Sequence, residues 1–357
     1  MYKINFPLYD DKGYINIPGI INFDPVNLCW IFLVLGRGTG KTFTALKEGL
    51  DRADADLGTF IYMRRTQDQC DLISRPEFSP INAINQQTGG DYMIAPITKK
   101  NAGIFHSEVN KDGIAQISGQ VLGITAGLST FRNLRGLSLE RTTLMIYDEF
   151  VPEPTERPLK HEGAALENAY ETINRNRELA GHDPLICLCM GNADDLANPL
   201  FQHFGWTDRA EWMIRNDREY YFDYGRRTAI YIPHDSPISR AKAGTALYAM
   251  SGHSKFTDMA IENRFAQEGT PGICTRPLRE YKPLVEVRGM CIYKHKDRPL
   301  YYVSHHLSGD PERFMESDIE LARFRRKYIY LWEAYMRERI EFESFSMMRT
   351  FEATFGA

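Results

Sequence analysis

The feature that most constrains the fold is an apolar stretch that runs directly into glycines. Residues 28–35 are apolar at every position, which is typical of a strand buried on both faces of a parallel sheet. Residues 43–52 then have helical character. A glycine-rich turn between such a strand and helix directs backbone N–H groups at an anion, and the helix N-terminus adds positive potential, so the pattern predicts a phosphate-binding loop. The residues of this loop, which end in a Lys–Thr pair, are Gly36-Arg37-Gly38-Thr39-Gly40-Lys41-Thr42.

Each part of this loop has an expected role in binding a nucleotide. We expect Lys41 to bridge the β- and γ-phosphates and the Thr42 hydroxyl to hold Mg²⁺. Leu35 departs from the usual pattern, which has glycine there, and we expect Gly36 to supply the tight turn instead. Arg37 is either a solvated loop charge or a contact to the nucleotide or to a neighbouring subunit. The predicted nucleotide-binding residues of the loop are Gly36, Arg37, Gly38, Thr39, Gly40, Lys41 and Thr42.

Two adjacent carboxylates follow a second apolar run, residues 142–147. In a sheet built around a phosphate loop this strand end lies beside the loop. We therefore expect Asp148 to hold Mg²⁺ through water and Glu149 to orient or deprotonate the attacking water. The repulsion between the two carboxylates would be offset by the cation; the alternative is an exposed acidic turn. A glutamate after the aspartate provides a base for water, which favours hydrolysis over phosphoryl transfer to a metabolite, with ATP and Mg²⁺ as cofactors.

Four more side chains are candidates for the same site. Arg175 and Arg177 end a predicted helix just before the strand at 185–190, where either could reach the γ-phosphate of a neighbouring subunit. Alternatively, both are solvated cations that complement the helix dipole. Asn192 follows that strand, where its carboxamide could sense the γ-phosphate or simply form a turn. Arg64 follows the apolar run 59–63 and could contact nucleotide or DNA, or face solvent.

The order of elements predicts an α/β fold. Apolar strands at 59–63, 142–147, 185–190 and 228–232 alternate with helices that begin at Asp68 and span 164–177. Strands that alternate with helices predict a doubly wound sheet, which we assign to residues 1–235. Residues 91–125 differ, because short strand-like pieces flank an Asp112–Gly113 turn, and they predict a β-hairpin excursion.

The sequence changes in character after residue 235. Residues 236–269 are rich in small residues and short helical patterns, so we expect a helical linker or lid. Residues 270–357 are expected to form a small α+β domain with strands at 284–293 and 300–304. A long helix is expected to start near Ser317, because acidic residues in its first turn complement the helix dipole.

Composition limits the possible functions without selecting one. A net charge of −4 gives no global basic field, although a DNA channel needs positive charge only where the polyanion passes. The six cysteines show no CxxC spacing, and we expect them to be reduced core residues. The longest strongly apolar run has eight residues, whereas a membrane span needs roughly 20, so we expect a soluble protein with no membrane partner.

Together the motifs resemble those of the DNA-packaging ATPases of small tailed phages with protein-primed genomes, a branch of the large-terminase motors. The similar pieces follow the family's order between residues 30 and 205. They are residues 36–42, 61–65, 146–150, 175–178, 187–193 and 198–199.

This resemblance implies an ATP-hydrolysing motor that translocates double-stranded viral DNA into a preformed procapsid. It implies a P-loop NTPase fold of the ASCE type and a homomeric ring, of five subunits, at the portal. It also implies that Arg175 acts in trans, that a packaging RNA takes part, and that the protein works in the host cytoplasm and transiently on the procapsid. The family's C-terminal domain has an RNase H-like fold. Because the strand at 284–293 carries only Glu286 as an acid, we predict a vestigial domain without nuclease activity.

Two other functions stay open from the sequence. One is another P-loop DNA translocase such as a helicase, although no second nucleotide-binding domain or helicase motif set is visible. The other is a nucleotide-binding assembly or docking protein without useful turnover, against which the Asp148–Glu149 pair argues.

Overall fold

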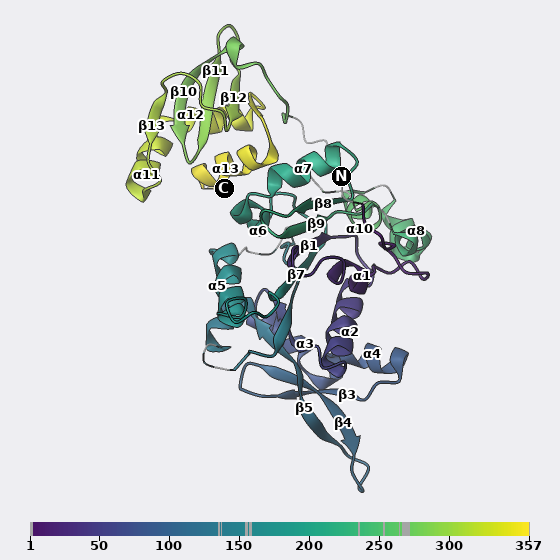
Figure 1. Ribbon diagram of the computed structural model, residues 1–357. Coiled ribbons are helices and arrows are strands. Elements are labelled where there is room, and N and C mark those ends of the chain that lie inside the picture. Colours follow the sequence, from purple (N-terminus) through teal and green to yellow (C-terminus); the bar gives the residue numbers. More distant parts are fainter. Residues whose placement is uncertain are drawn as a thin grey trace. The chain divides into compact units, whose positions relative to one another are not determined.

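A computed structural model describes residues 3–356 except 135, 137, 154–155, 157–158, 235, 253, 264 and 266–271 (Figure 1). The chain divides into two compact units. Unit 1 comprises Met1–Asp195 and Met213–Ala266, and unit 2 comprises Leu196–Trp212 and Gln267–Ala357. The boundaries that we predict from the sequence, 235/236 and 269/270, fall on or next to residues outside the described ones.

Unit 1 is built on a nine-stranded sheet in the order β3-β4-β5-β2-β6-β7-β1-β9-β8. The strands β5, β2, β6, β7, β1 and β9 are mutually parallel, whereas β3, β4 and β8 pair antiparallel to their neighbours. Their bounds are β1 Trp30–Val34, β2 Thr59–Arg64, β3 Tyr92–Pro96, β4 Ala102–Val109, β5 Ala115–Gly127, β6 Thr142–Asp148, β7 Ile186–Gly191, β8 Tyr220–Asp223 and β9 Thr228–Tyr231.

Helices cover both faces of this sheet, as a doubly wound α/β fold requires. Figure 1 shows α2 (Lys41–Asp54) and α5 (Glu162–Asn174) on opposite sides of the central strands. The other described helices of unit 1 are α1 Ile17–Ile21, α3 Gln67–Ile73, η1 Pro76–Phe78, α4 Ile81–Thr88, η2 Leu128–Leu134, α8 Pro237–Lys242, α9 Ala246–Ser251 and α10 Lys255–Glu262. Helix α6 Pro199–Phe204 belongs to unit 2, and α7 Thr207–Arg215 spans the boundary between the units. The predicted fold class is therefore confirmed.

The apolar runs form the centre of the sheet. Every residue of β7 is buried, and β1 is buried apart from its half-buried first residue. Cys187 and Cys189 lie on one face of β7 with their sulfurs 3.7 Å apart, and all six cysteines are free thiols. Five of them are buried as expected, whereas Cys274 is half-buried and lies outside the core.

The predicted hairpin excursion is also present. Strands β3, β4 and β5 form an antiparallel extension, and Asp112 and Gly113 lie in the turn between β4 and β5. The predicted helix at 164–177 ends earlier, at Asn174, because Arg175 has a φ of +43° and cannot continue the helical turn. The half-buried edge strand β8 and the short helices α1, α4, α6 and α7 were not predicted, since none of them carries a long periodic pattern.

Unit 2 contains a five-stranded sheet in the order β13-β10-β11-β12-β14. Strands β10 to β12 form an antiparallel meander, while β13 and β14 join its two edges in parallel. The bounds are η3 Leu278–Glu280, β10 Tyr281–Val287, β11 Met290–His295, β12 Tyr301–Ser304, β13 Glu312–Phe314, α11 Asp318–Lys327, α12 Ile329–Met336, β14 Ile340–Phe342 and α13 Phe345–Phe355.

Two expectations for this unit are corrected. The single strand expected at 284–293 is a hairpin, because Arg288 and Gly289 both have positive φ and turn the chain between β10 and β11. The long helix expected from Ser317 does begin there, with the Ser317 hydroxyl accepting from the Glu320 N–H at 3.3 Å. It ends at Lys327, because the next residue, Tyr328, has a φ of −112° and a ψ of 22° and separates α11 from α12. Among the described residues, no helix combines the length and apolar character of a membrane span.

Candidate functional site

The glycine-rich loop lies at the carboxyl end of β1, and its glycines are required for two different reasons. Gly38 and Gly40 have φ values of +73° and +83°, so they make the tight turn that we expected at Gly36. At Gly36 a Cβ would lie 2.6 Å from the carbonyl oxygen of Ala260, so the constraint is close approach. Leu35 is fully buried and its N–H donates to the Gly191 carbonyl, which explains why this position continues the strand.

Lys41 lies inside the loop, at the start of α2. Its Nζ donates to the carbonyls of Leu35 and Gly36, at 3.0 and 2.8 Å, and to Oδ1 of Asn192, at 2.9 Å. Burial lowers the pKa of Lys41 to about 8, because its direct partners are all neutral and do not replace the lost hydration. A phosphate at this position would supply the missing negative charge.

The Asp148 carboxylate accepts hydrogen bonds from hydroxyl groups on two other elements. One of its carboxylate oxygens, Oδ2, accepts from the Thr42 hydroxyl at 2.6 Å and from the Tyr62 hydroxyl at 2.8 Å. The Asp148 side chain is 1% exposed. A buried carboxylate beside a hydroxyl oxygen matches the hard oxygen ligands that Mg²⁺ prefers, so Thr42 and Asp148 fit this cation.

Glu149 lies at the rim of the same group, with an exposed fraction of 50%. Its φ of +59° is uncommon for a non-glycine residue and points to a constrained functional position. Arg64 forms an ion pair with Glu149, lies 3.6 Å from Asp148 Oδ2, and donates from Nε to the Tyr62 hydroxyl at 2.9 Å. Arg64 therefore bridges the two carboxylates.

Arg37 takes part in an ion pair with Glu153, beyond the acidic pair. Its backbone N–H donates to the Ala260 carbonyl at 3.1 Å, and its own carbonyl accepts from Lys242 Nζ at 3.4 Å. A Cβ on Gly38 would lie 1.5 Å from the Lys242 Nζ, so the lysine amine lies against the glycine-rich loop. Sequence reasoning missed Lys242, since no motif distinguishes it from other basic residues of the segment 236–269.

Arg175 and Arg177 lie at the opposite edge of the sheet from the loop. The Arg177 guanidinium donates to the carbonyls of Glu140, Thr142 and Asp183, at 2.7–3.0 Å, next to the first residue of β6. Asp148 is the last residue of that seven-residue strand, and such a strand is roughly 20 Å long. The structure thus does not bring these arginines to the glycine-rich loop. Arg175 is exposed and lines a cavity of about 360 Å³ with Arg177.

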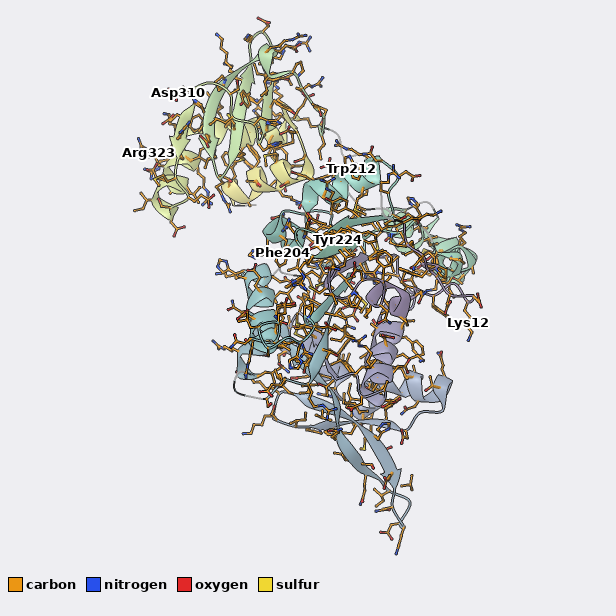
Figure 2. All side chains as sticks on the ribbon, in the orientation of Figure 1. Lys12, Phe204, Trp212, Tyr224, Asp310 and Arg323 are labelled. Atoms are coloured by element: carbon orange, nitrogen blue, oxygen red, sulfur yellow. The ribbon has the colours of Figure 1, made fainter. Side chains whose placement is uncertain are left out.

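A second cavity, of about 540 Å³, adjoins the loop at Gly40. Tyr14, Phe43, Lys47 and Gln87 are among its lining residues, together with Lys12 at the surface of unit 1 (Figure 2). Tyr14 packs so closely on Gly40 that a Cβ there would lie 2.7 Å from its ring. The cavity offers aromatic and polar side chains directly beside the start of α2.

Comparisons with known proteins agree with this architecture. No family model matches the chain. A DNA packaging protein of Bacillus phage B103 is 23% identical over 238 residues, which make up 66% of this chain and 64% of that protein, so the chain spans just under two thirds of its length.

Two solved structures match almost the whole chain. The gp11 DNA packaging motor of Phi-28 covers 92% of this chain and 95% of its own, with a TM-score of 0.59 and 18% identity. The viral genome packaging motor assembly of bacteriophage Phi-29 covers 96% and 98%, with a TM-score of 0.62 and 15% identity. The resemblance that the motifs predict is confirmed, and the fold of this chain is that of the phage DNA-packaging motors.

Proposed function

We propose that this chain is an ATPase that uses ATP hydrolysis to move double-stranded viral DNA into a procapsid. The observation that carries the proposal is the convergence of Lys41, Thr42, Asp148 and Glu149 at one edge of the parallel sheet. The likeness to a phage DNA packaging protein and to packaging motors supports the choice of substrate.

The loop residues from Gly36 to Thr42 bind the phosphates of ATP. Lys41 exchanges its carbonyl partners for the β- and γ-phosphates, and Lys242 adds a second cation beside Gly38. Thr42 and Asp148 would hold Mg²⁺, which would supply charge stabilisation of the transferring phosphoryl group. The cavity lined by Tyr14 and Phe43 takes the base and ribose, because it adjoins the loop and is about 540 Å³ in volume.

Glu149 accepts a proton from the attacking water, and Arg64 holds this carboxylate beside Asp148. Asn192 senses the γ-phosphate through Lys41, since the two side chains are hydrogen-bonded before the phosphate binds. When Lys41 turns to the phosphate, the Asn192 carboxamide loses its partner and becomes available to the nucleotide. This gives the carboxyl end of β7 a way to respond to the presence of ATP.

Completion of the active site requires a second copy of the chain in a ring. Arg175 is exposed and donates from Nε to the Thr172 carbonyl at 3.1 Å, whereas Arg177 is half-buried and donates to three backbone carbonyls. The greater exposure of Arg175 makes it the stronger candidate for the arginine that acts in trans. Arg37 is held by Glu153 and serves the loop of its own subunit. An arginine supplied in trans typically raises turnover by about 10³-fold or more.

The same proposal extends to the partners and the place of action. A ring of five subunits docks on the portal of the procapsid, with a packaging RNA between them, in the host cytoplasm. Unit 2 does not cut DNA. Support for an assembly comes from the Phi-29 neighbour, which is a genome packaging motor assembly.

The test is steady-state ATP hydrolysis with and without double-stranded DNA, over a range of protein concentrations. Turnover of the wild-type protein should rise with DNA and with concentration. Glu149→Gln should bind ATP but not hydrolyse it, while Glu77→Gln, an exposed carboxylate in η1, should behave like wild type. Turnover that is indifferent to DNA and equal in Glu149→Gln would leave a nucleotide-binding docking protein as the better assignment.

A further inference from the structure

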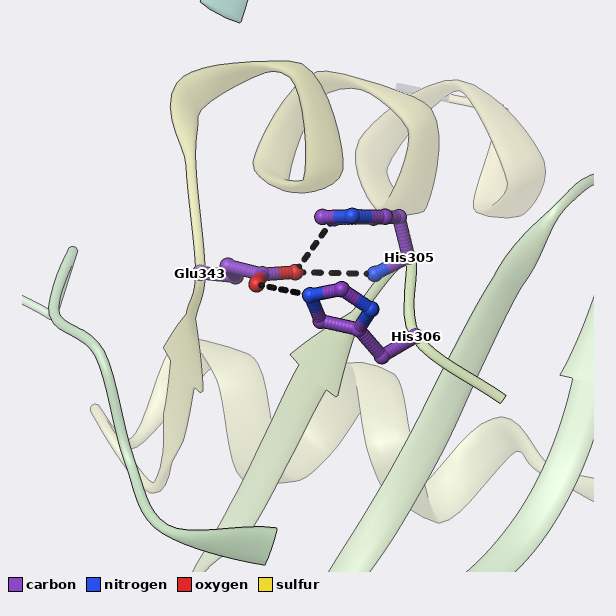
Figure 3. Close-up of side chains that lie close together, drawn as sticks. All are labelled: His305, His306 and Glu343. Carbon is purple, nitrogen blue, oxygen red and sulfur yellow. Dashed lines mark hydrogen bonds and ion pairs between the residues drawn. The ribbon is translucent and has the colours of Figure 1, made fainter. Parts of the chain in front are cut away.

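Two histidines and a glutamate meet at the end of the unit 2 sheet (Figure 3). His305 and His306 directly follow β12, and Glu343 directly follows β14. Because β12 and β14 are parallel neighbours, their carboxyl ends lie at the same edge. Among the described residues, this is the one group of three such donors whose ligand atoms all lie within 4.8 Å of one another.

The carboxylate is held in place by groups other than the histidine rings. Its Oε2 accepts from the Ser304 hydroxyl at 2.7 Å and from the His305 backbone N–H at 3.0 Å. Ser304 is 1% exposed, and its hydroxyl also accepts from the His306 N–H. Hydrogen bonds of this kind orient metal ligands in proteins, so the arrangement is organised before any ion arrives.

Each histidine faces a different oxygen of this carboxylate. Nδ1 of His305 lies 2.7 Å from Oε2, and Nε2 of His306 lies 3.5 Å from Oε1. Two ligands of one tetrahedral ion, with bonds of about 2.0–2.2 Å, are roughly 3.3 Å apart. The His306 distance matches this value, and the His305 ring needs only a small outward rotation. Its side chain is 52% exposed, which leaves space for that movement.

We propose that His305, His306 and Glu343 form a binding site for a divalent transition-metal ion of the Zn²⁺ class. Two imidazoles and one carboxylate favour such an ion over Mg²⁺, which prefers oxygen ligands alone. The exposed side of the histidines leaves a fourth position to water. The ion would join the end of β12 to the end of β14, a three-residue edge strand, and would thereby stabilise unit 2.

The experiment is a titration of the full-length protein with Co²⁺ and then Zn²⁺, in excess Mg²⁺ so that Asp148 and Thr42 are occupied. We expect one Co²⁺ per chain, seen as visible absorption bands of a low-symmetry site and displaced by Zn²⁺. Zn²⁺ should raise the melting temperature, because an ion that binds only the folded state stabilises it.

Two variants remove metal ligands and differ in how much they disturb the surrounding hydrogen bonds. His305→Ala/His306→Ala deletes both nitrogens, while Glu343→Gln keeps an oxygen that can still accept from Ser304. Both should weaken Zn²⁺ binding by at least about tenfold and abolish the melting-temperature shift. The matched control is His234→Ala, because His234 is also 52% exposed and pairs with a carboxylate, that of Asp217, at 3.0 Å.

The proposal is overturned if wild type, Glu343→Gln and the double variant bind Co²⁺ equally, or if the wild-type protein binds no ion at millimolar concentration. Loss of binding in His234→Ala alone would likewise assign the ion to another site. None of these readouts depends on ATP hydrolysis, so the outcome is independent of the proposed motor function.

Discussion

The two edges of the nine-stranded sheet carry different kinds of polar groups. At the carboxyl edge, Lys41, Thr42, Asp148 and Asn192 are hydrogen-bonded within a single chain. At the amino edge, Arg175 is exposed beside a cavity, roughly one strand length from the loop. The first edge holds the candidate nucleotide-binding residues within one chain. The second edge presents arginines far from those residues, and this contrast supports the proposal that the chemistry is divided between subunits.

Removing the exposed arginine tests this division directly. Arg175→Ala should lower DNA-stimulated turnover by about 10³-fold with little change in ATP affinity, because the arginine acts on a neighbour's γ-phosphate. Mixing Arg175→Ala with Glu149→Gln should restore part of the activity, since one subunit then supplies the intact acidic pair and the next supplies the arginine.

A mixture no more active than its components would confine catalysis to one chain. Arg177→Ala is the control. It removes hydrogen bonds to three carbonyls, so it should lower the melting temperature, and mixing should not repair that defect.

The second prediction concerns the carboxyl edge without nucleotide. Burial lowers the pKa of Lys41 to about 8, below the ordinary lysine value of about 10.4, so between these values the unfolded chain binds more protons than the folded one. Stability therefore rises with pH in this window. Between pH 8 and pH 10.5, the free energy of unfolding of wild type should rise by up to about 3 kcal/mol relative to that of Lys41→Met.

This gain should be measured by denaturant unfolding of both proteins, because other titrating groups cancel in the difference. A difference that stays constant with pH would mean that the Lys41 ammonium is well solvated. Adding ATP and Mg²⁺ should shrink the pH dependence, since phosphate favours the charged amine.

The smallest expected effect concerns Lys242. Its amine lies against Gly38 and is expected to contact phosphate, so Lys242→Ala should raise the dissociation constant for ATP by about tenfold, the value of one charge-assisted hydrogen bond. Equilibrium titration with a fluorescent ATP analogue measures the change. Lys111→Ala, an exposed lysine between β4 and β5, should bind like wild type, and equal affinity in both variants would remove Lys242 from the site.

Much of the fold was predictable because local patterns and burial agree. Continuous apolar runs predicted β1, β2, β6 and β7, because a strand covered on both faces does not carry polar side chains at alternate positions. The hairpin turn at Arg288 and Gly289 was missed, because the flanking residues are apolar enough to read as one strand. The half-buried strand β8 was missed for the opposite reason, as it lacks both a buried run and an alternating pattern.

Some residues of the candidate site were likewise predictable from the sequence, and others were not. The residue types of Lys41, Thr42, Asp148 and Glu149, and their places after strands, were sufficient to predict that they meet. The parts played by Tyr62 and Lys242 were not predictable, since each reaches the site only through contacts across the sheet or from a later segment. The cluster of His305, His306 and Glu343 needs the parallel pairing of β12 and β14, which no local pattern encodes.

Residues close together in the chain were enough to predict the class of fold, the glycine-rich loop and the acidic pair. The edge of the sheet that each arginine occupies, the glycine that makes the turn, and the approach of Lys242 to the loop follow only from the packed fold. Those features depend on strand pairing and on contacts between residues far apart in the chain, such as Lys242 and Arg37, which are 205 positions apart, and the energies that select such contacts arise only when the whole core is packed.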